Sequence, residues 1–553
     1  MARRIHTDRS RIEDFQRCHR LRFLRYHEAG TGIDSMNKPL PLAVGGSVHA
    51  GLAVLLREGQ ALVTDYQDES SPSRIEVSYW LKVEEMAVAA ALADFATHSA
   101  ALELDTTEAA GMVLNGSTGM VLNGSTTAES LAASLGLSAT DAGIPELSQR
   151  LGAAQEAFNA YLVAEQSALV EALVRAYARR RLRPLLEQFE VLEVEREGCW
   201  QLAEWKRNDP QASTDPVLSD WSLWFMSRPD ALLRERSTNQ LYIQSFKTAA
   251  SWDIRKARDA EHDMQGLSEG VEVERRLAQW WQRKQDFNEE KDPEPISRQM
   301  WDYLWTLSEP PRIHAIRYEY MLKGDRRSDK ELSARLQLDC RSQASHLVRR
   351  YEAVSTPAKG QNTGSFKIGD VCWSFEYIRP EDMRESKLAW QNWKIRPVWE
   401  RDGGVRGWID KLDSAASLMS GEDSTVGMEP RVLGFQCDAQ ALGVTAQHPL
   451  DAVFLPPIVV YRNDDDLRDW LESTEYQERE VAERVVEIES ASDEGERRSL
   501  LNRYFGMNRR ACIYPSECQF TKLCFGSDVV RKEPLSSGLY KRREYNHPQE
   551  GQP

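Results

Sequence analysis

The fold is decided by the run Arg228-Pro229-Asp230-Ala231-Leu232-Leu233 and the later run Leu241-Tyr242-Ile243-Gln244-Ser245-Phe246-Lys247-Thr248. Both runs are mostly apolar and alternate, and the polar segment Ser237-Thr238-Asn239-Gln240 lies between them. This pattern predicts a strand, a turn and a second strand. The first strand carries Asp230 and the second ends in Lys247. A carboxylate can bind a hard cation such as Mg²⁺, and a lysine beside it can orient a water and stabilise a developing phosphate charge.

These residues resemble the PD-(D/E)XK nuclease superfamily, because Pro229-Asp230 is followed after about fifteen residues by Lys247-Thr248. Within the superfamily, the likeness is to the RecB and AddB type and to the CRISPR-adaptation exonucleases. The resemblance implies an α/β fold with a restriction-endonuclease-like core, a mixed sheet flanked by helices, and large helical insertions. The chain departs from the family pattern at Ser245, where the family has Asp or Glu two residues before the lysine.

Composition and length fit a large soluble protein. The chain has 553 residues, which is room for two or three structural units, with 28% charged and 41% hydrophobic residues. It has no apolar run of membrane-spanning length and no signal-like N-terminus, so we expect a cytoplasmic protein without a membrane partner. The net charge of −16 does not exclude nucleic acid, because phosphate contacts need only a local basic groove.

The sequence predicts six segments. An Ala-, Ser-, Thr- and Gly-rich stretch contains a tandem octapeptide, residues 111–118 and 119–126, which is too short for a solenoid and predicts a flexible loop. The expected segments are residues 1–60 (N-terminal part of the nuclease core, with the first cluster cysteine), 61–185 (helical insertion with the repeat loop), 186–285 (nuclease core with the catalytic hairpin), 286–499 (accessory α/β region), 500–530 (C-terminal cysteine cluster) and 531–553 (tail).

Several helices are predicted from capping and charge patterns. Ser10 is expected to cap the first helix, with Glu13 completing a capping box. A second helix is expected to open at Gly45, and a long helix from about residue 145 is expected to end at Pro184. The highly charged stretch 476–498 predicts one helix with a solvated face.

The resemblance adds three candidate site residues. His49 follows the pattern Gly-x-x-His, which supplies a metal ligand in relatives; the alternative is a helix-face histidine bonded to a neighbour. Glu195, in the alternating run 191–197, matches a strand glutamate near the family's site, or is one of several exposed acids on a sheet edge. Gln265 matches the glutamine of a Gln-x-x-x-Tyr helix, although the tyrosine position holds Glu269.

The cysteines suggest a metal centre rather than a disulfide scaffold. Eight cysteines are few for this length, but Cys512, Cys518 and Cys524 are grouped, with five residues between neighbours. Thiolates are ligands for iron and zinc. Cys18 lies in an N-terminal Ser-x-x-x-x-Phe-x-x-Cys segment. The resemblance to AddB and the CRISPR-adaptation exonucleases implies that these four cysteines hold a 4Fe-4S cluster, with zinc as the alternative.

The resemblance implies a metal-dependent, exonuclease-like DNA nuclease of the RecB type, weakened by the serine at position 245. The expected partners are single-stranded DNA or duplex ends, with RNA left open, and protein partners in a larger complex. The alternative is a catalytically decayed nuclease-fold subunit that binds nucleic acid or acts as a scaffold in a repair, phage or defence complex. The expected site residues are His49 and Asp230 as ligands of Mg²⁺ or Mn²⁺, and Asp230, Lys247, Gln265, Glu195 and Ser245 for catalysis.

Overall fold

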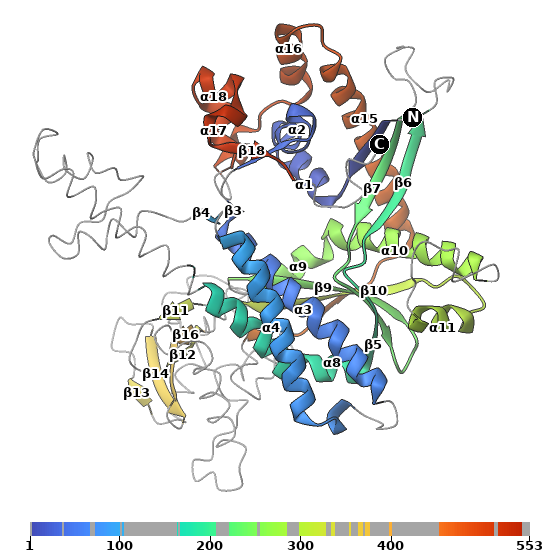
Figure 1. Ribbon diagram of the computed structural model, residues 1–553, viewed down its shortest axis with the longest axis vertical. Helices are drawn as coiled ribbons and strands as arrows, with labels where there is room; N and C mark the ends of the chain where they lie inside the picture. Colours follow the sequence, from blue (N-terminus) through green and yellow to red (C-terminus); the bar gives the residue numbers. More distant parts are fainter. Residues whose placement is uncertain are drawn as a thin grey trace, which may run out of the picture.

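A computed structural model shows a mixed α/β protein in which helices surround several sheets (Figure 1). Within the described ranges, no helix is both long and apolar enough to cross a membrane. The structure describes residues 3–35, 38–66, 72–99, 102–103, 163, 166–205, 221–250, 255–284, 298–323, 325–327, 333–337, 353–355, 363–368, 371–376, 398–400, 453–513 and 518–544.

A five-stranded mixed sheet lies at the centre, in the order β17-β10-β9-β8-β5. Strands β9 and β10 are parallel and the other neighbours are antiparallel. The predicted hairpin is confirmed, because Ala231 pairs with Gln244 and Arg234 pairs with Leu241. The strands are β5 (Phe189–Val194), β8 (Ala231–Glu235), β9 (Leu241–Ala249), β10 (Ile313–Leu322) and β17 (Ile458–Val460). Two of them follow residue 285, so the sheet extends beyond the segment in which the sequence placed its core.

Helices contribute to both faces of this sheet. Side chains alternate along β9, so Phe246 points to the face opposite from Ser245 and Lys247. Phe246 packs against His49 of α3 (Leu40–Asp65), which itself packs on α4 (Val77–Ser99). The other face carries α10 (Met264–Arg283), whose Gly266 lies so close to Ile316 and Tyr318 that a Cβ there would clash. The remaining helices around the sheet are α8 (Arg183–Gln188), α9 (Arg255–Glu261) and α11 (Arg298–Thr306).

The two ends of the described chain lie together beside the central sheet (Figure 1). The N-terminal strand β1 pairs in parallel with β7, which pairs with β6, and β2 near the N-terminus pairs with the C-terminal β18. These elements are β1 (Arg3–Thr7), α1 (Arg9–Arg17), α2 (His19–Tyr26), β2 (Ile33–Ser35), β6 (Gly198–Trp205), β7 (Trp221–Ser227), α15 (Asp464–Glu489), α16 (Glu494–Tyr504), η8 (Arg509–Cys512), α17 (Thr521–Phe525), α18 (Asp528–Lys532), η9 (Pro534–Ser537) and β18 (Tyr540–Arg542).

Smaller elements complete the described chain. Strand β3 pairs with β4, β11 pairs with β16, and a four-stranded sheet has the order β12-β15-β14-β13. Their bounds are η1 (Glu28–Gly30), β3 (Lys38–Pro39), η2 (Pro72–Arg74), β4 (Leu102–Glu103), η3 (Ala178–Leu182), β11 (Asp325–Arg327), β12 (Ser333–Gln337), β13 (Ala353–Ser355), β14 (Thr363–Ile368), β15 (Val371–Glu376) and β16 (Val398–Glu400). The tandem repeat lies outside the described residues.

Two predicted helix starts are wrong. Asp8, not Ser10, caps α1, because its carboxylate accepts a hydrogen bond from the Arg11 backbone N–H at 2.9 Å. Glu13 bonds the Arg9 side chain at 2.7 Å instead of closing a capping box. Helix α3 begins at residue 40, before the two glycines, so these lie inside its first turns rather than at its start.

The predicted helix end at Pro184 is also wrong. Residues 166–188 are helical, and Pro184 lies in the first turn of α8. A π-helical turn, Ala178–Leu182, precedes it and shifts the hydrogen-bonding pattern just before the proline. A proline needs no backbone N–H partner in the first turn of a helix, which is why the helical path continues.

The charged stretch 476–498 forms parts of two helices, α15 and α16, and its predicted solvated face is only partly correct. Glu478 of α15 is buried, with 1% of its side chain exposed. Its Oε2 accepts hydrogen bonds from Arg22 at 2.7 Å and Thr7 at 2.5 Å. Arg22 is equally buried, so this ion pair joins α2 and β1 to α15 inside the protein.

We predict that Glu478→Ala lowers the free energy of unfolding by about 3–5 kcal/mol, because it leaves the buried guanidinium of Arg22 without its carboxylate. Urea unfolding measures the change. The control is Glu480→Ala, on the same helix but 46% exposed, which should change stability by no more than about 0.5 kcal/mol. Equal effects of the two substitutions would contradict the assignment.

Candidate active site

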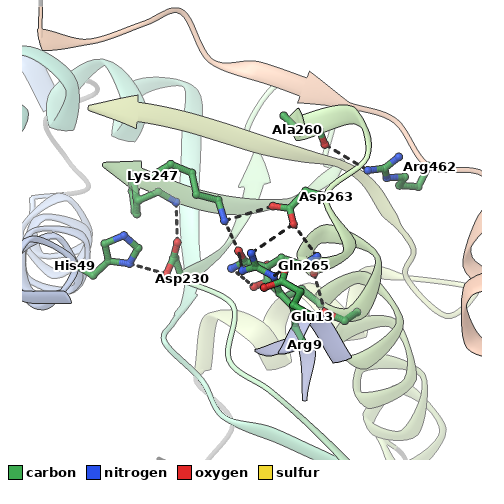
Figure 2. Close-up of polar contacts among 12 residues, drawn as sticks. Arg9, Glu13, His49, Asp230, Lys247, Ala260, Asp263, Gln265 and Arg462 are labelled. Atoms are coloured by element: carbon green, nitrogen blue, oxygen red, sulfur yellow. Dashed lines mark hydrogen bonds and ion pairs between the residues drawn. The ribbon is translucent and has the colours of Figure 1, made fainter. Parts of the chain in front are cut away.

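Asp230 is the centre of the site, immediately before β8 (Figure 2). Its Oδ2 accepts a hydrogen bond from the backbone N–H of Phe246 at 2.6 Å, across the hairpin. Its Oδ1 lies 3.1 Å from Nδ1 of His49, which comes from α3. The hairpin register and one helix therefore fix both carboxylate oxygens and bring His49 into contact with Asp230.

The contact between His49 and Asp230 has the character of an ion pair. Burial lowers the pKa of His49, but the charge and hydrogen bond of Asp230 outweigh it, so the pKa lies above its ordinary value. Burial raises the pKa of Asp230, but His49, the Phe246 N–H and Lys247 outweigh it, so that pKa lies below its ordinary value. The Asp230 carboxylate is therefore held ionised within a largely buried site.

Lys247 points from the end of β9 toward α10 (Figure 2). Its Nζ donates a hydrogen bond to the side-chain oxygen of Gln265 and lies 3.4 Å from Asp263 Oδ2. Arg9 donates to the same Gln265 oxygen and lies 3.7 Å from Asp263. Asp263 also caps α10 by accepting from the Gln265 backbone N–H at 3.0 Å. The start of α10 therefore fixes the position of the lysine.

Glu269 lies one turn beyond Gln265 and accepts a hydrogen bond from its side-chain nitrogen at 2.6 Å. Only 3% of Glu269 is exposed. Burial, together with the negative charge of Asp230, raises its pKa to about 8, although Lys247, Gln265 and Arg9 oppose the shift. Glu269 is therefore an additional acid within electrostatic reach of Asp230.

Ser245 and Glu195 differ in their relation to the site. Ser245 is fully buried two residues before Lys247, and its hydroxyl has no hydrogen-bond partner among the described residues. Glu195 lies just beyond β5 at a positive φ of 47°, so the strand ends before it. Its N–H donates to the Asp230 carbonyl at 3.0 Å, and its carboxylate lies 3.8 Å from Arg57. Glu195 therefore borders the site.

Sequence analysis missed Arg9 and Asp263. Arg9 lies just outside the Ser-x-x-x-x-Phe-x-x-Cys segment, and it reaches Gln265 only because α1 packs beside α10. Asp263 had a usable signal, since an aspartate directly before an amphipathic helix is a good N-cap. Asp263 lies at the break between α9 and α10. Gln265 and Glu269, four residues apart, lie on one face of α10.

The four candidate cluster cysteines lie where the chain ends meet. Cys18 separates α1 from α2, and its sulfur accepts from the Asn508 N–H at 3.3 Å. The Cys518 N–H donates to the Cys512 carbonyl at 2.9 Å. Burial raises the pKa of Cys524 to about 11; Arg20 opposes the rise, and the other three cysteines add to it. The thiols of Cys18, Cys512, Cys518 and Cys524 are therefore close enough to influence one another.

Ligand chemistry at the two places differs. Carboxylates and an imidazole suit Mg²⁺ or Mn²⁺, and a group of thiols suits iron or zinc. Among the residues that the structure describes, no three His, Cys, Asp or Glu side chains are arranged to hold a metal ion.

Comparison with known proteins gives no match: the sequence fits no family model and is similar to no curated protein.

The raised pKa of Glu269 predicts a pH-dependent stability. The folded protein holds this proton more tightly than the unfolded chain, whose value is near 4.5. The resulting stabilisation is complete below that value and is lost as pH rises through about 8. With EDTA present, the melting temperature of the wild type should therefore fall more steeply between about pH 6 and about pH 9 than that of Glu269→Gln. The exposed control Glu480→Gln should retain the wild-type slope, whereas parallel curves for Glu269→Gln and wild type would refute the prediction.

Proposed function

We propose that the protein is a metal-dependent nuclease that hydrolyses phosphodiester bonds in DNA. The observation that carries the proposal is the convergence of His49, Asp230, Lys247 and Gln265 from four elements of the fold (Figure 2). A fixed carboxylate, an imidazole and a lysine held by an amide form a donor set suited to a divalent cation and a phosphate. A solvated strand acid and a solvated strand lysine would not need to meet in this way.

The fold is consistent with a core like that of the PD-(D/E)XK nucleases. Helix α3, strands β5, β8 and β9, helix α10 and strand β10 follow one another along the chain and make a mixed sheet with helices on both faces. Asp230 and Lys247 lie at the same end of adjacent strands, since β8 begins where β9 ends. This proposed core places the acid and the lysine within one site.

Each residue has a distinct role in the proposed reaction. Asp230 and His49 would bind Mg²⁺ or Mn²⁺, and the cation would polarise the phosphate and lower the pKa of a bound water. Lys247 would orient the attacking water and stabilise charge on the phosphate oxygens. Gln265 would hold Lys247 in place. Water adds to phosphorus, the P–O bond to the leaving nucleotide breaks, and the leaving oxygen takes up a proton.

Ser245 favours the second candidate, a decayed nuclease fold that binds nucleic acid without cutting it. A serine hydroxyl brings no charge to a divalent cation, and here it is buried without a partner among the described residues. We favour catalysis because Lys247 and Gln265 remain hydrogen-bonded beside an ionised Asp230.

We predict that Lys247→Ala lowers DNA cleavage by about 100-fold or more while leaving DNA binding nearly unchanged, because it removes a charge that acts on the reacting phosphate. Asp230→Asn should lower cleavage similarly and also weaken Mn²⁺ binding. The assay uses labelled single- and double-stranded DNA with Mg²⁺ or Mn²⁺.

Two surface substitutions serve as matched controls. Lys541→Ala removes a lysine that is 43% exposed on β18, and Asp464→Asn removes a carboxylate that is 70% exposed at the start of α15. Both should cleave as the wild type does. Wild-type cleavage by Lys247→Ala and Asp230→Asn would show that the catalytic centre lies elsewhere, and DNA binding without any wild-type cleavage would favour the decayed fold.

We further propose that Cys18, Cys512, Cys518 and Cys524 hold a 4Fe-4S cluster, with zinc as the alternative metal. The support is the meeting of one N-terminal and three C-terminal thiols in a mostly apolar setting. Such a cluster would tie the chain ends together. It would add to the pairing of β2 with β18 and to the hydrogen bond from Arg20 to the Phe505 carbonyl at 2.8 Å.

Cys518→Ser should therefore lower the iron content and the melting temperature together, because metal binding is coupled to folding. Iron analysis and absorbance of anaerobically purified protein measure the first effect, and thermal denaturation measures the second. Cys199→Ser, on β6 and outside this group, should leave both unchanged. If the wild type contains zinc and no iron, the metal site stands but its metal is zinc. If the wild type contains neither metal, the cluster is excluded.

A further inference from the structure

Glu269 is a buried carboxylate that the proposed roles of the site do not use. One of its oxygens, Oε1, accepts the hydrogen bond from Gln265, but Oε2 is buried and has no hydrogen-bond partner among the described residues. Leaving a buried carboxylate oxygen without a partner is unfavourable. A buried acid of this kind needs a reason to be kept beside the ionised Asp230, whose charge opposes its ionisation.

A cation between the two acids would supply that reason. Burial and the negative charge of Asp230 raise the pKa of Glu269, so the metal-free protein disfavours a second ionised carboxylate beside Asp230. A divalent cation attracts both carboxylates and offsets this effect. Lys247 and Arg9 also lie near, but they bond the oxygen of Gln265 and the carboxylate of Asp263.

Glu269 lies on the face of the sheet where an acid is missing. Ser245 and Lys247 are two residues apart on β9, so both point toward α10, which carries Glu269. A hydrogen-bonded chain runs from Lys247 through the Gln265 amide to Glu269. A carboxylate on α10 can thus occupy the same region between sheet and helix as a carboxylate at position 245 of β9 would.

We propose that Glu269 is the second carboxylate of the cation site, acting with Asp230 in the place of the acid that position 245 lacks. The inference rests on the proposed function, since it concerns the same cation. Mg²⁺ keeps several of its waters when bound to protein, so a carboxylate can hold it through a water. Glu269 therefore does not have to reach the ion directly, which agrees with a metal-free arrangement that has no three ligands in place among the described residues.

The test measures Mn²⁺ binding to the full-length protein, by titration calorimetry and by electron paramagnetic resonance of free MnCl₂, at one fixed pH. Asp230→Asn identifies which binding belongs to the site. Glu269→Gln keeps an acceptor for Gln265 and removes only the charge. We expect it to raise the Mn²⁺ dissociation constant about 10-fold or more. Glu269→Asp retains the charge on a shorter side chain and should have a smaller effect.

The matched control is Glu274→Gln on the same helix. Glu274 is half-buried and accepts a hydrogen bond from the Ile313 N–H at 2.9 Å, which a glutamine oxygen can still accept. The Glu274→Gln protein should bind Mn²⁺ as the wild type does. A purely structural role of Glu269 would lower the melting temperature without changing Mn²⁺ affinity.

Each outcome of the titration decides one question. Weaker binding by Glu269→Gln with unchanged binding by Glu274→Gln supports the second carboxylate. Wild-type affinity in Glu269→Gln overturns it and leaves the proposed nuclease site intact. If Glu269→Gln does not fold, Glu269→Ala, which also removes the carboxylate, decides in its place, and wild-type affinity there overturns the inference. If Asp230→Asn binds Mn²⁺ as the wild type does, or if neither binds it, the proposed cation site itself fails.

Discussion

The structure around the site depends on the hydrogen bond from the Phe246 backbone N–H to the Asp230 carboxylate. This bond crosses the hairpin at the point where β8 begins and β9 ends, so the pairing register sets the position of the acid. The second carboxylate oxygen is then directed to His49 on α3. The next residue along β9, Lys247, points to the opposite face and meets α10. This backbone hydrogen bond thus positions Asp230 between His49 of α3, on one face of the sheet, and the contact of Lys247 with α10 on the other.

The chain ends pack together as a second region beside the central sheet. The N-terminal helices α1 and α2 pack with the C-terminal segments through the buried pair of Arg22 with Glu478 and through the cysteine group. Arg9 of α1 connects these chain ends to the site, because its side chain donates a hydrogen bond to Gln265 at the start of α10. Arg9 therefore connects the packing of the chain ends to the start of α10, where Gln265 bonds Lys247.

Sequence patterns predicted the parts of the site that depend on local order. The alternation around residues 228–248 predicted the hairpin that holds Asp230 and Lys247. Long-range packing decided the rest. Glu478 is buried because Arg22, from another helix, reaches it. Neither this pair nor the contact of Arg9 with Gln265 at the start of α10 is indicated by the local sequence.

The most direct test of the central claim is an anomalous diffraction experiment on crystals of the wild-type protein soaked in MnCl₂. The account predicts an anomalous peak at the start of β8, within bonding distance of the Asp230 carboxylate and the His49 ring, with the hydrogen bond between these two side chains broken. Manganese bound only at other places in the protein, with Asp230 still bonded to His49, would contradict the claim that these residues form a cation site.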